Sequence, residues 1–333
     1  MYLNVRNILF QPHARFRNRS VRFCLYGGYY MNIKDFDIWK ALYIDKFDTQ
    51  KYLYHYTPAE TAMKILHSNT LLFGKLSNAN DTTESKIRIS FDSPTDESNK
   101  TYLEKCQAIT DYLRENKDGF QLLCFSMDTY VKTKMRTEYL KKISENEAYY
   151  DVYGRGFALP RMWAQYAHNH NGVCFIFNKE KIVEKVKSDR SFYEAGPVHY
   201  ADIASTYHIK EKQIDSIYNK IKIESNGNLP YLTEMKNNDF LKYNFFEKSA
   251  DWANEQEYRI IIYTNSCKSE RQKISDLADA IEGIVIGERM EDTHKEVLRI
   301  LFEKTFKNKG IGKKEIRDRI KRICFNEQIC RLK

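Results

Sequence analysis

The chain has 333 residues, of which 42% are hydrophobic and 30% charged, and both Gly and Pro are scarce. These values are typical of a globular protein and exclude a fibrous or intrinsically disordered chain. The longest apolar runs, at 173–177 and 260–263, are only strand-sized, so we expect no membrane span and a cytoplasmic protein. Seven scattered cysteines without a Cys-x-x-Cys pair indicate reduced thiols rather than a disulfide framework or a zinc site.

The net charge of +9 is concentrated at the two ends of the chain. Residues 1–30 contain five arginines and no acidic residue, and they lack the apolar stretch of a secretory signal. We interpret them as a disordered basic arm. Alternatively, the sequence begins too early, and Met31 is the true first residue. Residues 307–333 carry ten basic and three acidic residues, and their isoleucines follow a helical spacing. A basic helical tail is therefore predicted.

The basic residues of this tail are candidates for binding a nucleic acid. On a helix they would share one exposed face, to which phosphate groups would bind. A solvated helix that only keeps the protein soluble is the alternative. The predicted nucleic-acid-binding residues, expected near the catalytic cleft, are Lys313, Lys314, Arg317, Lys321 and Arg322.

Residues 31–306 are predicted to form a single α+β domain. Aromatic and β-branched runs indicate strands, whereas helical spacing and capping residues indicate helices. Thr57 is expected to cap one helix, with Pro58 at its first position and Glu60 completing the capping box. In chain order we expect a helix over 34–47, a strand over 51–56, a helix from 58 to about 68, a strand over 71–74, a polar loop over 76–84, a helix over 104–115 and a strand over 120–127.

The second half continues this irregular alternation. We expect a helix over 160–167, a strand over 172–178, a helix over 207–224, a strand through 255–263, a helix over 274–281, a strand over 283–287 and a helix over 291–306. Residues 179–241 are polar and are interpreted as a helical insertion or lid. Because strands are dispersed among helices of irregular length, the predicted fold class is α+β, with a mixed or antiparallel sheet and surrounding helices.

The run Glu255-Gln256-Glu257, ahead of the apolar residues 260–263, is the most informative motif. A strand alternates its faces, so Glu255 and Glu257 should project from one side, with Arg259 two residues further along. One interpretation is the polar rim of a solvated strand. The other is a site where a carboxylate stabilises positive charge that develops on a sugar.

His55 is the candidate partner of this motif, since it lies near the end of the first predicted strand of the domain, at the junction with the next helix, and faces away from Tyr54 and Tyr56. A structural histidine is the alternative. Trp163 and Tyr166 lie three residues apart on one helix face, which indicates core packing or a stacking surface for a flat ring.

The order of these motifs resembles a bacterial family called domain of unknown function 2971. The residues that carry the resemblance are Tyr54-His55-Tyr56-Thr57, the loop 76–84 with Asn80, Cys124-Phe125-Ser126, the segments 162–166 and 172–174, Glu255-Gln256-Glu257-Tyr258-Arg259 and Ile286-Gly287. More distantly, the pattern is similar to the ADP-ribosyltransferase superfamily. Its histidine-type members have a His on the first strand of a split sheet, aromatic residues that stack on nicotinamide and a Glu on a late strand.

This resemblance implies a split sheet and NAD as a substrate. It implies catalysis by Glu257, with Glu255 orienting the acceptor and His55 binding the ribose, and it requires no metal. Either Trp163 or Tyr166 would stack on nicotinamide. The other implied NAD-binding residues are Tyr56, Thr57, Asn80, Ser126 and Arg259.

We therefore expect a toxin or phage-defence effector that transfers ADP-ribose to a macromolecule. The basic ends favour a nucleic acid, RNA or DNA, as that macromolecule, and an antitoxin protein is a potential partner. Two rivals stay open. One is a non-enzymatic nucleic-acid-binding protein in which the Glu255 motif is structural. The other is a metal-dependent nuclease that uses Asp81, Glu84, His55 and Glu257.

Overall fold

The computed structural model describes residues 22–25, 29–32, 51–93, 100–128, 155–190, 192–224, 239–264, 270–307, 311–326 and 329–332. The helix predicted over 34–47 lies outside these residues. At the end of the predicted basic arm, β1 (Arg22–Leu25) pairs antiparallel with β2 (Tyr29–Asn32), which extends two residues beyond the arm.

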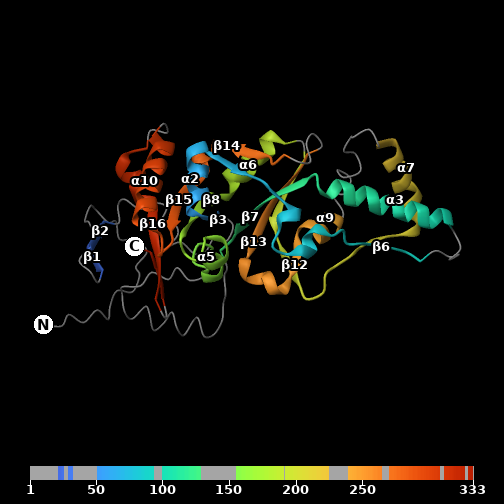
Figure 1. Cartoon of the computed structure of the whole chain (residues 1–333), viewed down its shortest axis with the longest axis horizontal. Helices are drawn as coiled ribbons and strands as arrows, with labels where there is room; N and C mark the ends of the chain where they lie inside the picture. Colours follow the sequence, from blue (N-terminus) through green and yellow to red (C-terminus); the bar gives the residue numbers. More distant parts are fainter. Residues whose placement is uncertain are drawn as a thin grey trace, which may run out of the picture.

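Nine of the described strands form one large sheet (Figure 1). Its order is β17-β16-β15-β8-β3-β7-β13-β9, with β5 also paired to β7. The pair β15–β16 is parallel and the other pairs are antiparallel, so the predicted α+β fold with a mixed sheet is confirmed. The strands are β3 (Tyr52–Pro58), β5 (Gly74–Lys75), β7 (Phe120–Ser126), β8 (Gly172–Asn178), β9 (Tyr193–Pro197), β13 (Glu257–Tyr263), β15 (Ile281–Ile286), β16 (Ile320–Asn326) and β17 (Ile329–Leu332).

The sheet opens between β3 and β7. These strands share a single register pair, Tyr54 with Ser126. Further along β7, the short strand β5 takes the same edge and pairs Gly74 with Leu122. One edge of β7 therefore forms its backbone hydrogen bonds with β3 at Ser126 and with β5 at Gln121 and Leu122. Between these two points, β3 and β7 are separated by a gap.

Three buried clusters hold helices against this sheet. The first lies under α2 (Ala59–Ser68), α6 (Lys179–Asp189) and α10 (Asp292–Lys307), whose apolar residues join those of β8, β13 and β15. The second lies under α5 (Pro160–Tyr166) on the opposite face. The third joins the ends of β7 and β13 to α3 (Lys100–Lys117), α7 (Glu211–Glu224) and α9 (Asp239–Phe245), which lie towards the right of Figure 1.

Short elements connect these layers. They are β4 (Thr70–Leu72) paired with β14 (Lys273–Ser275), β6 (Ile89–Phe91) with β11 (Tyr207–Ile209), and β10 (His199–Ala201) with β12 (Glu247–Ser249). Four 3₁₀ turns, η2 (Leu76–Asn78), η3 (Thr82–Ser85), η5 (Ala250–Glu255) and η6 (Leu277–Asp279), complete this set within the described residues.

Three local predictions are wrong. Thr57 belongs to β3, and Pro58 takes the N-cap position of α2 without a side-chain cap. No helix spans 274–281, because Asp276 adopts a left-handed backbone (φ 58°) between β14 and η6. The stretch 179–241 is not a purely helical insertion, since β9 lies in it and extends the main sheet beside β13.

The predicted basic helical tail is also wrong. Helix α11 covers only Lys313–Asp318, and the β-branched residues that follow enter β16, parallel to β15. Lys321 and Arg322 therefore lie on a strand. Five strand spacings, roughly 24 Å, separate β16 from β13. The five predicted nucleic-acid-binding residues thus do not form one helical face beside the Glu257 cleft.

Candidate active site

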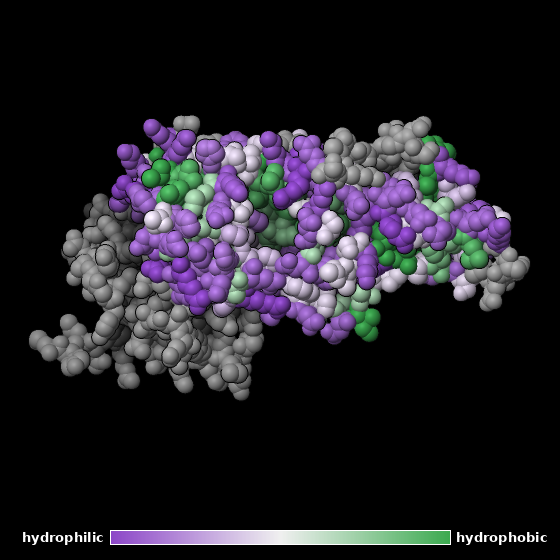
Figure 2. Space-filling model, in the orientation of Figure 1, coloured by the Kyte–Doolittle hydropathy of each residue, from purple (hydrophilic) through white to green (hydrophobic). Residues whose placement is uncertain are grey.

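The opening in the sheet contains a cavity of about 390 Å³. In Figure 2 this face of the molecule is mostly hydrophilic, with a recessed hydrophobic area near the middle, close to β7 in Figure 1. Residues from β3, β5, β7, α5 and the loop after β5 line the cavity, together with the start of β13. It brings together most of the predicted site residues, namely His55, Tyr56, Asn80, Ser126, Tyr166, Glu255, Glu257 and Arg259.

Glu257 and Arg259 form the centre of a buried ionic network on the cavity wall. The Nε of Arg259 donates to Oε1 of Glu257 at 2.6 Å, and its Nη2 donates to Oε2 at 3.0 Å. The same Nη2 donates to Glu84, and Nη1 donates to the carbonyl oxygen of Phe245 at 2.7 Å. This guanidinium therefore fixes two carboxylates and a backbone carbonyl at once.

Lys248, from β12, is the second cation of this network. Its Nζ lies 2.7 Å from Oε2 of Glu255, 3.2 Å from Oε2 of Glu257 and 3.8 Å from Oε2 of Glu84. All five charged side chains are at most 5% exposed. Three carboxylates therefore share two cations in this network.

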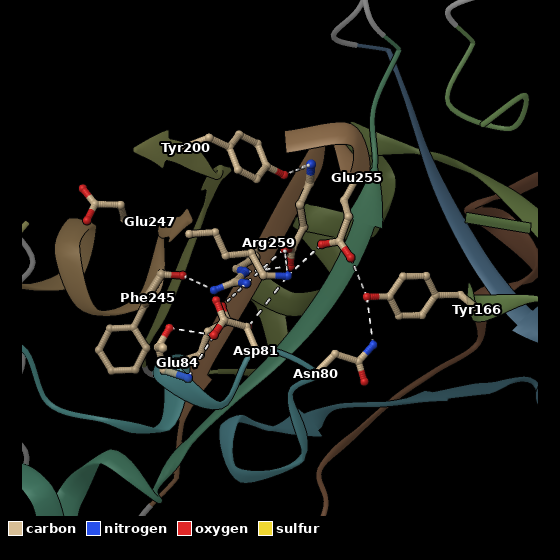
Figure 3. A network of polar contacts seen from close by, with 12 residues as sticks. Asn80, Asp81, Glu84, Tyr166, Tyr200, Phe245, Glu247, Glu255 and Arg259 are labelled. Carbon is tan, nitrogen blue, oxygen red and sulfur yellow. Dashed lines mark hydrogen bonds and ion pairs between the residues drawn. The ribbon is translucent and has the colours of Figure 1, made fainter. Parts of the chain in front are cut away.

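Glu255 is held on its other side by Tyr166 of α5 (Figure 3). The Tyr166 hydroxyl donates to Oε1 of Glu255 at 2.6 Å and accepts from Nδ2 of Asn80 at 3.1 Å. Glu255 ends η5 rather than lying on the strand as predicted, and Gln256 has a left-handed backbone. That kink, and not strand alternation, brings Glu255 and Glu257 to the same ammonium group.

The network controls the protonation of its members. Burial alone would raise the pKa of Glu257, but Arg259 and then Lys248 lower it to about 2, so this carboxyl is ionised. For Glu84, burial outweighs Arg259 and Lys248, and its pKa is raised. Burial lowers the pKa of Lys248, but the three carboxylates raise it by more, so Lys248 stays an ammonium.

The strand register places Glu257 beside Ser126. Glu257 pairs with Ser126, which pairs with Tyr54, so these three side chains point to the same face. The Ser126 hydroxyl is buried and has no hydrogen-bond partner among the described residues. A buried polar group without a partner costs free energy, and a ligand in the cavity would satisfy it.

His55 points to the opposite face from Tyr54, as the sequence predicted, but it meets the same cavity through the gap. Its Nδ1 lies 3.2 Å from the carbonyl oxygen of Cys124, and its ring packs edge-on against Phe125. Burial lowers the pKa of His55 and the Cys124 carbonyl raises it, with burial prevailing, so a neutral imidazole is favoured.

One protein-family model, described as protein of unknown function (DUF2971), matches residues 162–260. The match supports the DUF2971 family. No curated protein matches the chain, and no solved structure matches it. The DUF2971 segment supplies Tyr166, Lys248, Glu255 and Glu257 to the site, whereas His55, Glu84 and Ser126 come from residues before it.

Two predicted NAD-binding residues do not line the cavity. Trp163 is fully buried, donates from Nε1 to the carbonyl oxygen of Phe157 at 2.7 Å and packs edge-on against Tyr56. It is a core residue, so the stacking role predicted for it is wrong. Thr57 is likewise buried, in β3. Of the two stacking candidates, only Tyr166 borders the cavity.

The nuclease hypothesis required Asp81, Glu84, His55 and Glu257 to converge. Asp81 instead caps η3, where its Oδ1 accepts from the backbone N of Thr83 at 2.9 Å, and Glu84 is bound to Arg259. In the part of the chain that the structure describes, no three His, Cys, Asp or Glu side chains are grouped so as to hold a metal ion. Likewise, no described helix is both long and apolar enough to cross a membrane.

Lys248 is the site residue that sequence reasoning missed. It lies seven residues before Glu255, and η5 intervenes, so neither strand nor helix periodicity links the two. Glu84 was considered only as a metal ligand. The sequence did contain one signal for a further cation: if Glu255 and Glu257 are both buried, the single charge of Arg259 cannot balance them.

Proposed function

We propose that the protein is an NAD-dependent ADP-ribosyltransferase whose reaction centre is Glu257. The observation that carries the proposal is the pair formed by an ionised, buried Glu257 and the unsatisfied hydroxyl of Ser126, side by side on the wall of a cavity. An anion and a polar group without a partner are suited to a ligand that presents positive charge and hydrogen-bonding groups.

The arrangement of the strands supports the proposal. Among the described residues, β3 is the first strand of the main sheet in chain order, and it carries His55 beside the gap. Glu257 begins the late strand β13, two strands away. A His on the first strand of a split sheet and a Glu on a late strand form the pattern that histidine-type ADP-ribosyltransferases have.

The chemistry assigned to Glu257 is electrostatic. Breaking the bond between nicotinamide and its ribose leaves positive charge on the ribose, while the bonding electrons depart with the neutral nicotinamide. A carboxylate bound to the neighbouring ribose hydroxyl stabilises that charge, and removing one such preorganised group typically slows a reaction about a hundredfold or more. A nucleophile of the acceptor then attacks the ribose carbon and loses its proton.

Glu257 keeps capacity for a substrate. A carboxylate has about four lone-pair positions. Three N–H groups of Arg259 and Lys248 occupy three of them, and the remaining contact is the weakly donating thiol of Cys124. A ribose hydroxyl is a stronger donor than this thiol. The ionised Glu257 then stabilises the positive charge that develops on the ribose.

The surrounding residues have complementary roles in this proposal. Ser126 binds the carboxamide of nicotinamide, and Tyr166 provides the aromatic surface beside it. Glu255 orients the acceptor nucleophile, since Tyr166 and Lys248 fix both of its oxygens at the cavity wall. His55 binds the ribose from the other side of the gap.

We propose a nucleic acid as the acceptor and a toxin or defence role for the transfer. The net charge of +9 supports a polyanionic acceptor. The experiment is to incubate the purified full chain with NAD labelled in the adenylate part, together with RNA, DNA or cell lysate. Label transferred to RNA or DNA supports the whole proposal, and label on protein redirects the acceptor. No loss of NAD with any acceptor refutes the transferase and leaves the ionic network a structural feature.

A further inference from the structure

We propose that the end of the cavity formed by Lys75 and Arg271 is a phosphate-binding subsite for a nucleotide. The inference deepens the proposed function, because it would hold the diphosphate of NAD. It is carried by different residues from those that would cleave the ligand, and it can therefore be tested separately.

The cavity is electrically polarised. Four cationic and three anionic side chains line it. Lys248 and Arg259 lie with the three carboxylates at one end of the cavity. Lys75 and Arg271 belong to the other end, which also contains Gly74 and Leu122.

The backbone of this cationic end is rigidly fixed to β7. Lys75 pairs with Gln121, whose buried side chain donates from Nε2 to the carbonyl oxygen of Glu270 and accepts from the backbone N of Gln272, both at 2.8 Å. Arg271, between those two residues, donates from Nε to the carbonyl oxygen of Phe73 at 2.7 Å. Among the described residues this bond uses only Nε, which leaves both terminal nitrogens of the guanidinium to donate to a phosphate.

The separation of the two ends matches an elongated ligand. On β7, Leu122 lines the cationic end and Ser126 the acidic end, four residues or roughly 14 Å of strand apart. In a dinucleotide such as NAD, the diphosphate is separated by the ribose from the bond to nicotinamide that would be broken. One ligand could therefore contact both ends of the cavity. Leu72, 45% exposed, lines the cationic end and offers an apolar surface to a nucleobase.

The test is to measure ADP binding to the full chain by calorimetry, with adenosine as the probe that lacks phosphate. We expect ADP to bind more tightly than adenosine. Arg271→Gln and Lys75→Gln should each weaken ADP about tenfold, as expected for the loss of one charge-assisted contact, and leave adenosine unchanged. Lys273→Gln, which removes an exposed cation two residues from Arg271 but outside the cavity lining, is the matched control and should bind ADP normally.

The outcomes separate this inference from the proposed function. If ADP does not bind the wild-type chain, or if both cavity variants bind it like Lys273→Gln, the phosphate subsite is refuted. If wild-type chain cleaves NAD but neither variant changes the KM for NAD or the affinity for ADP, the transferase stands and the subsite does not. If both variants lose ADP affinity while wild-type chain leaves NAD intact, the subsite stands and the transferase is refuted.

Discussion

Replacing Lys248 with methionine tests whether this ammonium holds the three carboxylates together. At an effective dielectric constant of about 20, attraction over its distances of 2.7, 3.2 and 3.8 Å to Glu255, Glu257 and Glu84 is worth roughly 4 to 6 kcal/mol for each pair. Most of this offsets the cost of taking the ammonium from water. Removing one partner of a buried ionic network typically costs about 3 to 5 kcal/mol, and we expect Lys248→Met to lower the free energy of unfolding by that amount at pH 7.

Urea denaturation at several pH values measures this effect. Because the carboxylates left behind repel each other, the loss should shrink as the pH is lowered towards 5 and one of them takes up a proton. The double variant Lys248→Met/Glu255→Gln removes one charge of each sign and should recover part of the lost stability. A loss below about 1 kcal/mol for the single variant, or strict additivity in the double variant, would refute the network as described.

Three further effects are expected. The pKa of Glu257, depressed to about 2, contributes about 3 kcal/mol that is fully present above pH 4.5 and is lost as the pH falls to 2; acid titration of unfolding should show this loss in wild-type chain and not in Glu257→Gln. Burial, followed by the charge of Arg88, lowers the pKa of Lys117 to about 7, so the unfolded chain binds more protons between pH 7 and 10.5 and stability should rise by about 2 kcal/mol from pH 7 to 9; an equal rise in Lys117→Met would disprove this. Trp163→Phe should destabilise the fold and leave NAD turnover unchanged, since it removes the donor to the Phe157 carbonyl and part of a core side chain, whereas Tyr166→Phe should alter NAD turnover through its contact with Glu255; the reverse pattern of turnover would return the stacking role to Trp163.

The sequence was sufficient to predict the fold class and most strands, because strands such as β8 and β13 have β-branched or aromatic residues at most of their positions. It failed where long-range pairing decided the structure. Ile316, Ile320 and Ile323 are spaced by four and three residues, which fits a helix, and only pairing with β15 makes the segment 320–326 a strand. The left-handed backbone at Asp276 similarly overrode an apparent helix.

The site was predicted in part for the wrong reason. Glu255 and Glu257 do converge, but through the kink at Gln256 rather than through one strand face. The charge balance indicated a second cation but could not identify it as Lys248, because the contact depends on how β12 pairs with β10 and places the ammonium beside β13. Trp163 and Tyr166 looked equivalent in sequence, and only the packing of α5 against β3 separates a core residue from a cavity residue.

The central claim is that Glu257 cleaves NAD, and release of nicotinamide from NAD by the purified chain tests it most directly. The comparison needs a control with a similar structural cost. Glu247→Gln provides one, since Glu247 is also a buried carboxylate paired with an arginine, Arg88 at 2.9 Å, but does not line the cavity.

We expect wild-type chain and Glu247→Gln to release nicotinamide at comparable rates. Glu257→Gln, with a verified fold, should be slower by about a hundredfold or more. Equal rates for Glu257→Gln and wild-type chain, or no release by wild-type chain with any acceptor present, would contradict the account.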